Sequence, residues 1–178
     1  MFIFSSTIET PIGQMRACAN HEGVCLLEFI ERKDLSKQVE NLKKNLKSEI
    51  ITGTNEYLEK LKKQLAEYFS GKRENFNLPF VMTGTVFQQK VWKTLLEIPF
   101  GKTMTYKELT NQIGDPKAIR AVAGANGANK MAIIIPCHRV IGSDGNLTGY
   151  AGGIWQKQWL LEHESEQISL DFENQRLL

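Results

Sequence analysis

The chain has 178 residues, a formal net charge of +2 and three cysteines. This length suits one large domain or two small ones. The apolar runs are too short to span a membrane, and residues 1–6 lack the basic and long apolar regions of a secretory signal. Because an odd number of cysteines argues against a disulfide framework, we expect a cytoplasmic protein with free thiols.

The charge is distributed unevenly along the chain. Residues 81–160 contain nine Lys or Arg against four Asp or Glu, whereas residues 161–178 contain one against five. A basic segment suits a surface that faces phosphate groups. A solvated basic face without a partner is the alternative interpretation.

The first eighty residues predict a small sheet followed by helices. Apolar segments separated by turn signals fill residues 1–30 and favour an antiparallel sheet. Apolar residues at helical spacing follow over residues 33–46 and 55–69, and small and charged residues at 70–75 then break the pattern. We therefore predict a domain boundary near residue 80. Cys18, His21 and Cys25 match no common zinc spacing, so we predict no metal.

Three short helices are predicted after this boundary. Thr85 and Thr105 each precede a Gln or Glu by three residues, which is the pattern of a capping box. Gly114 closes the second helix, and Asp115 with Pro116 supplies the start of a third helix that runs to about Ala125.

The second and third helices form a predicted helix-turn-helix, in which the later helix usually contacts DNA. That later helix is rich in alanine and glycine. Its slim shape suits the narrow minor groove, where the sequence code is degenerate. Tight packing inside a core is the alternative.

An unusual run follows, in which residues 133–135 are all isoleucine and Pro136 comes next. The isoleucines predict a buried strand that the proline ends, so Cys137 is expected at the mouth of the strand. We expect the adjacent His138 and Arg139 to lower the pKa of this thiol from about 8.5 toward neutrality. An inert buried cysteine is the alternative.

The last predicted elements are a hairpin, a loop and a helix. Residues 140–147 contain an Asp-Gly turn between short apolar arms, and residues 148–153 form a glycine-rich loop. The final helix is expected over residues 154–164, where it buries Trp155, Trp159 and Leu160. Residues 166–178 are expected to form an acidic tail.

The string Pro136-Cys137-His138-Arg139-Val140, with Asn129 before it and Tyr150-Ala151-Gly152-Gly153 after it, closely resembles the signature of the O6-alkylguanine-DNA alkyltransferases. The resemblance is clear from Thr85 to Glu164 and weak before that. It implies an α/β (α+β) fold, with a ribonuclease-H-like domain over residues 1–80. A mostly helical, winged helix-turn-helix-like domain would then cover residues 81–165.

The resemblance also implies an activity. The protein would flip O6-methylguanine, and also O4-methylthymine, out of double-stranded DNA and move the alkyl group irreversibly onto Cys137, once per molecule. His138 would act as the base through a water molecule, with Glu164 holding the imidazole. The implied partner is DNA with alkylated guanine, and the implied protein is a monomer without a cofactor.

Further roles follow from the same resemblance. Asn129 would order the turn beside the thiol, Tyr106 would donate to the leaving guanine, and Arg120 would fill the stack that the flipped base leaves. The other expected DNA-contacting residues are Thr105, Lys117, Ala118 and Ala121, and the expected pocket residues are Pro136, Val140, Ser143, Tyr150 and Ala151. The chain departs from the common family pattern at Lys130, where proline is usual, and at Ile119, which is larger than usual.

Two other functions are compatible with these residues. A cysteine hydrolase would use Cys137 and His138 as nucleophile and base, although neighbours on a strand point to opposite faces. Turnover of an ester would identify it. A helix-turn-helix regulator or lesion sensor would instead leave Cys137 unmodified by alkylated DNA.

Overall fold

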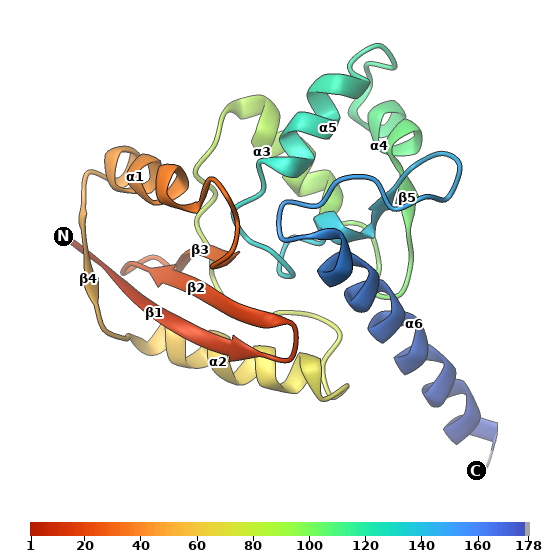
Figure 1. Cartoon of the computed structure of the whole chain (residues 1–178), viewed down its shortest axis with the longest axis horizontal. Coiled ribbons are helices and arrows are strands. Elements are labelled where there is room, and N and C mark those ends of the chain that lie inside the picture. The colour runs from red at the N-terminus through yellow and green to blue at the C-terminus, as the bar shows by residue number, and fades with distance from the viewer. Residues whose placement is uncertain (177–178) are drawn as a thin grey trace.

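The structure, a computed structural model, describes residues 1–176 of the chain (Figure 1), and it describes side chains as far as Glu166. A small sheet with two helices forms the N-terminal half, and four helices and a short two-stranded sheet follow. The elements are β1 (Phe2–Thr10), β2 (Gly13–Ala19), β3 (Val24–Phe29), α1 (Leu35–Leu46), β4 (Glu49–Thr52), α2 (Glu56–Phe69), α3 (Val86–Leu95), β5 (Met104–Thr105), α4 (Tyr106–Ile113), α5 (Ile119–Gly127), the 3-10 helix η1 (Cys137–Arg139), β6 (Val140–Ile141) and α6 (Ile154–Arg176).

The N-terminal sheet has the strand order β3-β2-β1-β4. The predicted antiparallel pairing of its first three strands is confirmed. The parallel pairing of β4 with β1 was not predicted, because the four residues of β4 follow a helix directly and are mostly exposed. Helices α1 and α2 pack into separate apolar clusters on the sheet, so both of its faces are covered.

Helices α3, α4 and α5 pack against one another, and Trp92 of α3 donates a hydrogen bond to the Ala125 carbonyl of α5 (2.8 Å). Both predicted capping boxes are present. The predicted start of the third helix was wrong. Asp115 instead closes a turn by accepting from the backbone N–H groups of Lys117 and Ala118, and α5 begins at Ile119.

The predicted strand over residues 133–135 was also wrong. These residues form turns, and Ile133 has a φ of 72°, which is rare for a β-branched residue. The segment just before them is bound to the edge of β3, since Leu27 donates to the Lys130 carbonyl and accepts from the Ala132 N–H. The isoleucines are therefore buried by packing against the sheet without belonging to it.

The C-terminal part differs from the prediction in three ways. Strand β6 pairs in parallel with β5 instead of forming a hairpin, although the turn at Asp144-Gly145 is present. Helix α6 continues to Arg176, so the expected acidic tail is helical that far, and residues 177–178 lie outside the described part. Trp155 is 57% exposed, because it lies on the open side of α6, while Leu160 is buried as predicted.

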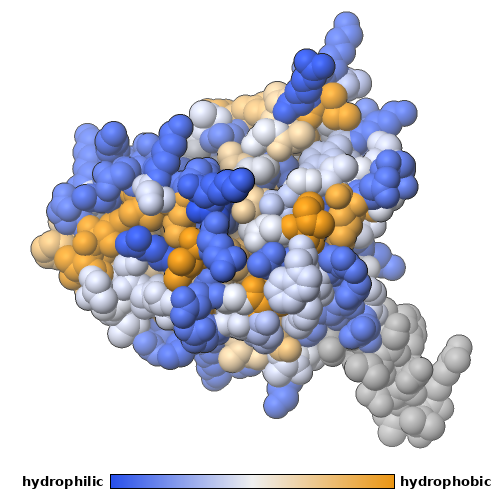
Figure 2. Space-filling model, in the orientation of Figure 1, coloured by the Kyte–Doolittle hydropathy of each residue, from blue (hydrophilic) through white to orange (hydrophobic). Residues whose placement is uncertain are grey.

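The surface is mixed in character. Figure 2 shows one face, on which hydrophobic areas are separated by hydrophilic side chains. Exposed hydrophobic residues on the sheet include Phe2 and Ile51. Among the residues that the structure describes, no helix is both long enough and apolar enough to cross a membrane.

Candidate active site

Cys137 is the first residue of η1, and its side chain is buried. The side-chain amide of Asn129 donates to the Cys137 sulfur (3.1 Å) and to the Ile135 carbonyl (2.9 Å), while its oxygen accepts from the Met131 N–H. One asparagine therefore holds the turn together and supplies a donor to the sulfur.

The expected lowering of the thiol pKa was wrong. Burial raises the pKa of Cys137 to about 11, although Asn129 opposes this change. The guanidinium of Arg139 does not face the sulfur, because it donates to Glu164 and to the Ile98 carbonyl. The prediction relied on sequence adjacency and was wrong for that reason, and the Cys137 side chain at neutral pH is a protonated thiol.

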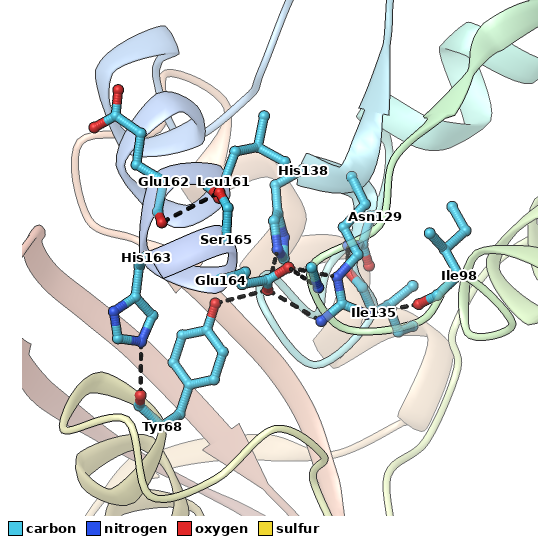
Figure 3. Close-up of polar contacts among 12 residues, drawn as sticks. Tyr68, Ile98, Asn129, Ile135, His138, Leu161, Glu162, His163, Glu164 and Ser165 are labelled. Carbon is cyan, nitrogen blue, oxygen red and sulfur yellow. Dashed lines mark hydrogen bonds and ion pairs between the residues drawn. The ribbon is translucent and has the colours of Figure 1, made fainter. Parts of the chain in front are cut away.

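Glu164 is the centre of a buried polar network (Figure 3). Its carboxylate accepts from His138 Nε2 (2.8 Å), from Arg139 Nε (2.8 Å) and Nη2 (3.0 Å), from the Tyr68 hydroxyl (2.8 Å) and from the Gly101 N–H (3.3 Å). Burial would raise the pKa of this carboxyl, but His138 and Arg139 outweigh burial and hold the pKa well below its usual range. Glu164 is therefore ionised at neutral pH.

The contact with Glu164 determines how His138 is protonated. Burial lowers the pKa of His138, so the imidazole is neutral at pH 7. Because Nε2 faces a carboxylate, the proton of the neutral ring resides on Nε2. The other nitrogen, Nδ1, is buried and has no hydrogen-bond partner among the described residues. This free lone pair is available to accept a proton.

A cavity of about 670 Å³ opens onto the thiol. It separates the exposed face of α5 from the loop at residues 148–152. Of the residues predicted from the sequence, the cavity is lined by Tyr106, Arg120, Asn129, Cys137, Ser143, Tyr150 and Ala151.

The remaining predicted residues lie outside this lining. Pro136 and Val140 are buried beside Cys137 along the chain. Thr105 is the N-cap of α4, and Ala118 is the N-cap of α5. Lys117 is exposed in the turn before α5, and Ala121 is exposed on α5 itself. His138 and Glu164 belong to the buried network beside the cavity.

Tyr106 begins α4, and its ring borders the cavity. Burial raises the pKa of its hydroxyl, which therefore keeps its proton at neutral pH. The Asn126 side chain donates to this oxygen (3.3 Å), so the Tyr106 hydroxyl is the acceptor in that contact and its own proton points to another partner. Asn126 also lines the cavity, and no motif in the sequence pointed to it.

Three other residues at the site were missed. Lys157 is fully buried in α6 and donates to the carbonyls of Val140 (2.5 Å) and Thr148 (3.2 Å), which ties the loop to β6. Glu28 and Arg32 line the cavity from the N-terminal sheet and the turn after it. The helical spacing of apolar residues predicted burial of Trp155, Trp159 and Leu160 but not of Lys157. No pattern in the sequence connected residues 28 and 32 with Cys137.

These features define a class of protein in which a pair of short helices, of the kind that binds DNA, borders a buried thiol next to a buried histidine. Comparison with protein-family profiles identifies the family within that class. Residues 86–166 match the profile described as the DNA binding domain of 6-O-methylguanine DNA methyltransferase, and residues 3–82 match its ribonuclease-like domain. The chain belongs to the 6-O-methylguanine DNA methyltransferase family.

Individual relatives agree with this assignment. A methylated-DNA–protein-cysteine methyltransferase of Methanosarcina barkeri is 45% identical over 93% of this chain and 99% of its own length. The crystal structure of Mycobacterium tuberculosis O6-methylguanine methyltransferase has a TM-score of 0.79 and 39% identity over 93% of this chain and 94% of that one. Mycobacterium tuberculosis OGT in complex with DNA has a TM-score of 0.78 and 39% identity over 94% of both chains.

Proposed function

We propose that this protein repairs DNA by transferring the methyl group of O6-methylguanine to its own Cys137. The observation that carries this proposal is a buried thiol that opens onto a cavity bordered by the exposed face of α5. A base in a duplex is out of reach of a buried sulfur, so the guanine is flipped into the cavity. O4-methylthymine presents a similar methylated oxygen and is the second substrate.

The reaction is an in-line displacement at the methyl carbon. The S–C bond forms as the C–O6 bond breaks. The thiol proton passes through a water molecule to His138 Nδ1, and Asn129 stabilises the developing thiolate. Tyr106 donates to the leaving base, and the proton that guanine gains balances the proton that the thiol loses. Because no group reverses a thioether, each molecule reacts once.

The exposed face of α5 is suited to DNA, because it presents the small residues Ala121, Ala123 and Gly124 and the cation Arg120. We infer that this face enters the minor groove and that Arg120 occupies the space of the flipped base. Every group used in this scheme comes from one chain, so a monomer is sufficient for the reaction. Residues 1–80 and 81–165 serve as two domains, joined along β3.

The first prediction concerns stoichiometry. Incubation with excess duplex carrying one O6-methylguanine should add one methyl group per protein molecule and then stop. Intact-mass spectrometry follows the plateau, and peptide mapping should place the methyl on Cys137. Cys18 and Cys25 are buried thiols and serve as internal controls. Product beyond one equivalent would point to a turnover enzyme such as a hydrolase, and an unmodified protein would point to a lesion sensor.

A second prediction tests His138 as the base. In His138→Gln, the amide can still donate to Glu164 but accepts no proton, so the single-turnover rate should fall by about a hundredfold or more at pH 7. Because the thiol pKa is about 11, the rate of the variant should then rise as the pH is raised from 7 to 9. The wild-type rate should change little over that interval, since its neutral imidazole is already the base.

The matched control for this variant is His163→Gln. His163 is a second buried histidine in the same region, and it contacts the Tyr68 carbonyl (2.8 Å). The His163→Gln variant should keep the wild-type pH profile. A loss in His138→Gln that is the same at every pH would mean that the histidine only supports the fold.

A further inference from the structure

Glu28 is a buried acid that the scheme above does not use. It lies on β3 and is 2% exposed. Its Oε2 atom is 3.3 Å from Arg32 Nη1, yet it forms no hydrogen bond with any described residue. The donors of Arg32 are directed elsewhere, to the carbonyls of Asn129 (3.0 Å) and Gly127 (2.9 Å) and to Asp34. A buried carboxylate oxygen is therefore left with unused acceptor capacity.

The Glu28 side chain belongs to the wall of the cavity that contains the thiol, as does Arg32, which pairs with it. Glu28 and Cys137 line the same cavity, and the Glu28 carboxylate is close enough to the sulfur to raise the pKa of Cys137 further. The hydroxyl of Tyr150, also in the wall, is likewise buried and unpartnered among the described residues. The cavity wall thus includes two polar side chains, each with a buried oxygen that has no hydrogen-bond partner among the described residues.

The position of these groups is fixed by packing. The Tyr150 ring meets the Phe29 ring edge-on, with centroids 6.4 Å apart. A Cβ atom at Gly152 would collide with the ring of Phe29, so the loop lies directly on β3. Glu28 therefore belongs to a rigid wall, where a carboxylate discriminates between ligands by charge and by hydrogen bonding.

We propose that Glu28 selects among the groups attached to guanine O6. It favours substituents that end in a hydrogen-bond donor, such as a carboxamide or a hydroxyl, and it disfavours those that end in an anion. This inference rests on the proposed function. A methyl group occupies only the space next to the sulfur, whereas a longer substituent extends past the reacting carbon toward the rest of the cavity wall. There, a donor satisfies the Glu28 oxygen and a carboxylate is repelled by it.

The transfer itself is unchanged. The sulfur bonds to the CH₂ carbon that carries the terminal group, the C–O6 bond breaks, and guanine leaves with a proton that matches the one lost by the thiol. The two informative substrates are duplexes with O6-carbamoylmethylguanine and O6-carboxymethylguanine. Their substituents have nearly the same shape, and only the second is charged.

The experiment measures single-turnover transfer of both groups at pH 8, above the Glu28 pKa of about 7, which burial has raised. Each rate is divided by the rate of the same protein on O6-methylguanine. The reaction of a small free thiol with the two substrates gives their intrinsic reactivity ratio. The wild-type preference for the carboxamide should exceed that ratio by about tenfold, the size expected for one screened charge pair.

Glu28→Gln should remove most of this preference, because it keeps the shape and removes the charge. Asp34→Asn is the matched control, since Asp34 also pairs with Arg32 but does not line the cavity. It should keep the wild-type preference. The wild-type comparison does not depend on the folding of any variant, and a wild-type ratio equal to that of the free thiol would overturn the inference. A protein that transfers no methyl group would instead contradict the proposed function.

Discussion

Glu164→Ala is expected to lower the free energy of unfolding by about 3 to 5 kcal/mol, which is the cost of leaving a buried charge without its partner. Arg139 is the residue that would lose its partner, because it is 7% exposed and directs two donors at the lost carboxylate. The Tyr68 hydroxyl and the Gly101 N–H would lose an acceptor as well. Urea denaturation followed by circular dichroism measures the change.

Two matched variants separate charge from hydrogen bonding at this site. Tyr68→Phe removes one donor and should cost only about 1 kcal/mol. Glu164→Gln keeps an acceptor but loses the charge. Its cost in the free energy of unfolding should lie between the costs of Glu164→Ala and Tyr68→Phe. The carboxyl has a lowered pKa, so its stabilisation is present above its unfolded value of about 4.3 and is lost only as the pH falls through the lower folded value. A cost for Glu164→Ala no larger than that for Tyr68→Phe would show that Arg139 finds water or another partner.

The network explains how distant segments assemble the site. Glu164 comes from α6, Tyr68 from α2, Gly101 from the connection before β5, and His138 with Arg139 from η1. Their separation along the chain reaches 96 residues. Breaking this network is therefore expected to loosen the packing of α2 against η1. It should also leave the His138 imidazole less firmly positioned.

Local signals in the sequence predicted what local interactions determine. Thr85 and Thr105 form the capping boxes that their spacing indicates, and the strands of the first thirty residues pair as expected. The string around Cys137 indicated the family, because its five residues are specific. These features depend on neighbours within a few positions, so pattern reasoning reaches them.

Features that depend on distant contacts escaped prediction. The isoleucines before Pro136 look like a strand because they are buried, but their burial comes from packing near the edge of β3. The effect of Arg139 on the thiol was misjudged because Glu164, which redirects it, is 25 positions away. Glu28 lines the cavity because the fold places β3 beside Cys137. The periodicity of apolar residues in the sequence contains no information about that contact.

Arg120→Ala is expected to reduce single-turnover transfer from duplex DNA by about a hundredfold or more, while transfer from free O6-methylguanine base changes little. The arginine is exposed on α5 and lines the cavity. If its side chain fills the gap left by the flipped base, it stabilises the extruded state, which costs a few kcal/mol to reach. A free base needs no extrusion, so only the cavity, Tyr106 and Cys137 act on it.

Lys117→Ala is the matched control, because Lys117 is another exposed cation in the turn before α5 but does not line the cavity. It should weaken DNA binding and reduce the salt dependence of binding without changing the rate at saturating DNA. Rates are therefore measured at saturating DNA and fixed salt, so that a loss of affinity cannot imitate a loss of flipping. If Arg120→Ala slows transfer from duplex and free base equally, Arg120 supports the cavity itself and the stack-filling role is wrong. If it behaves like Lys117→Ala, the arginine only contacts phosphate.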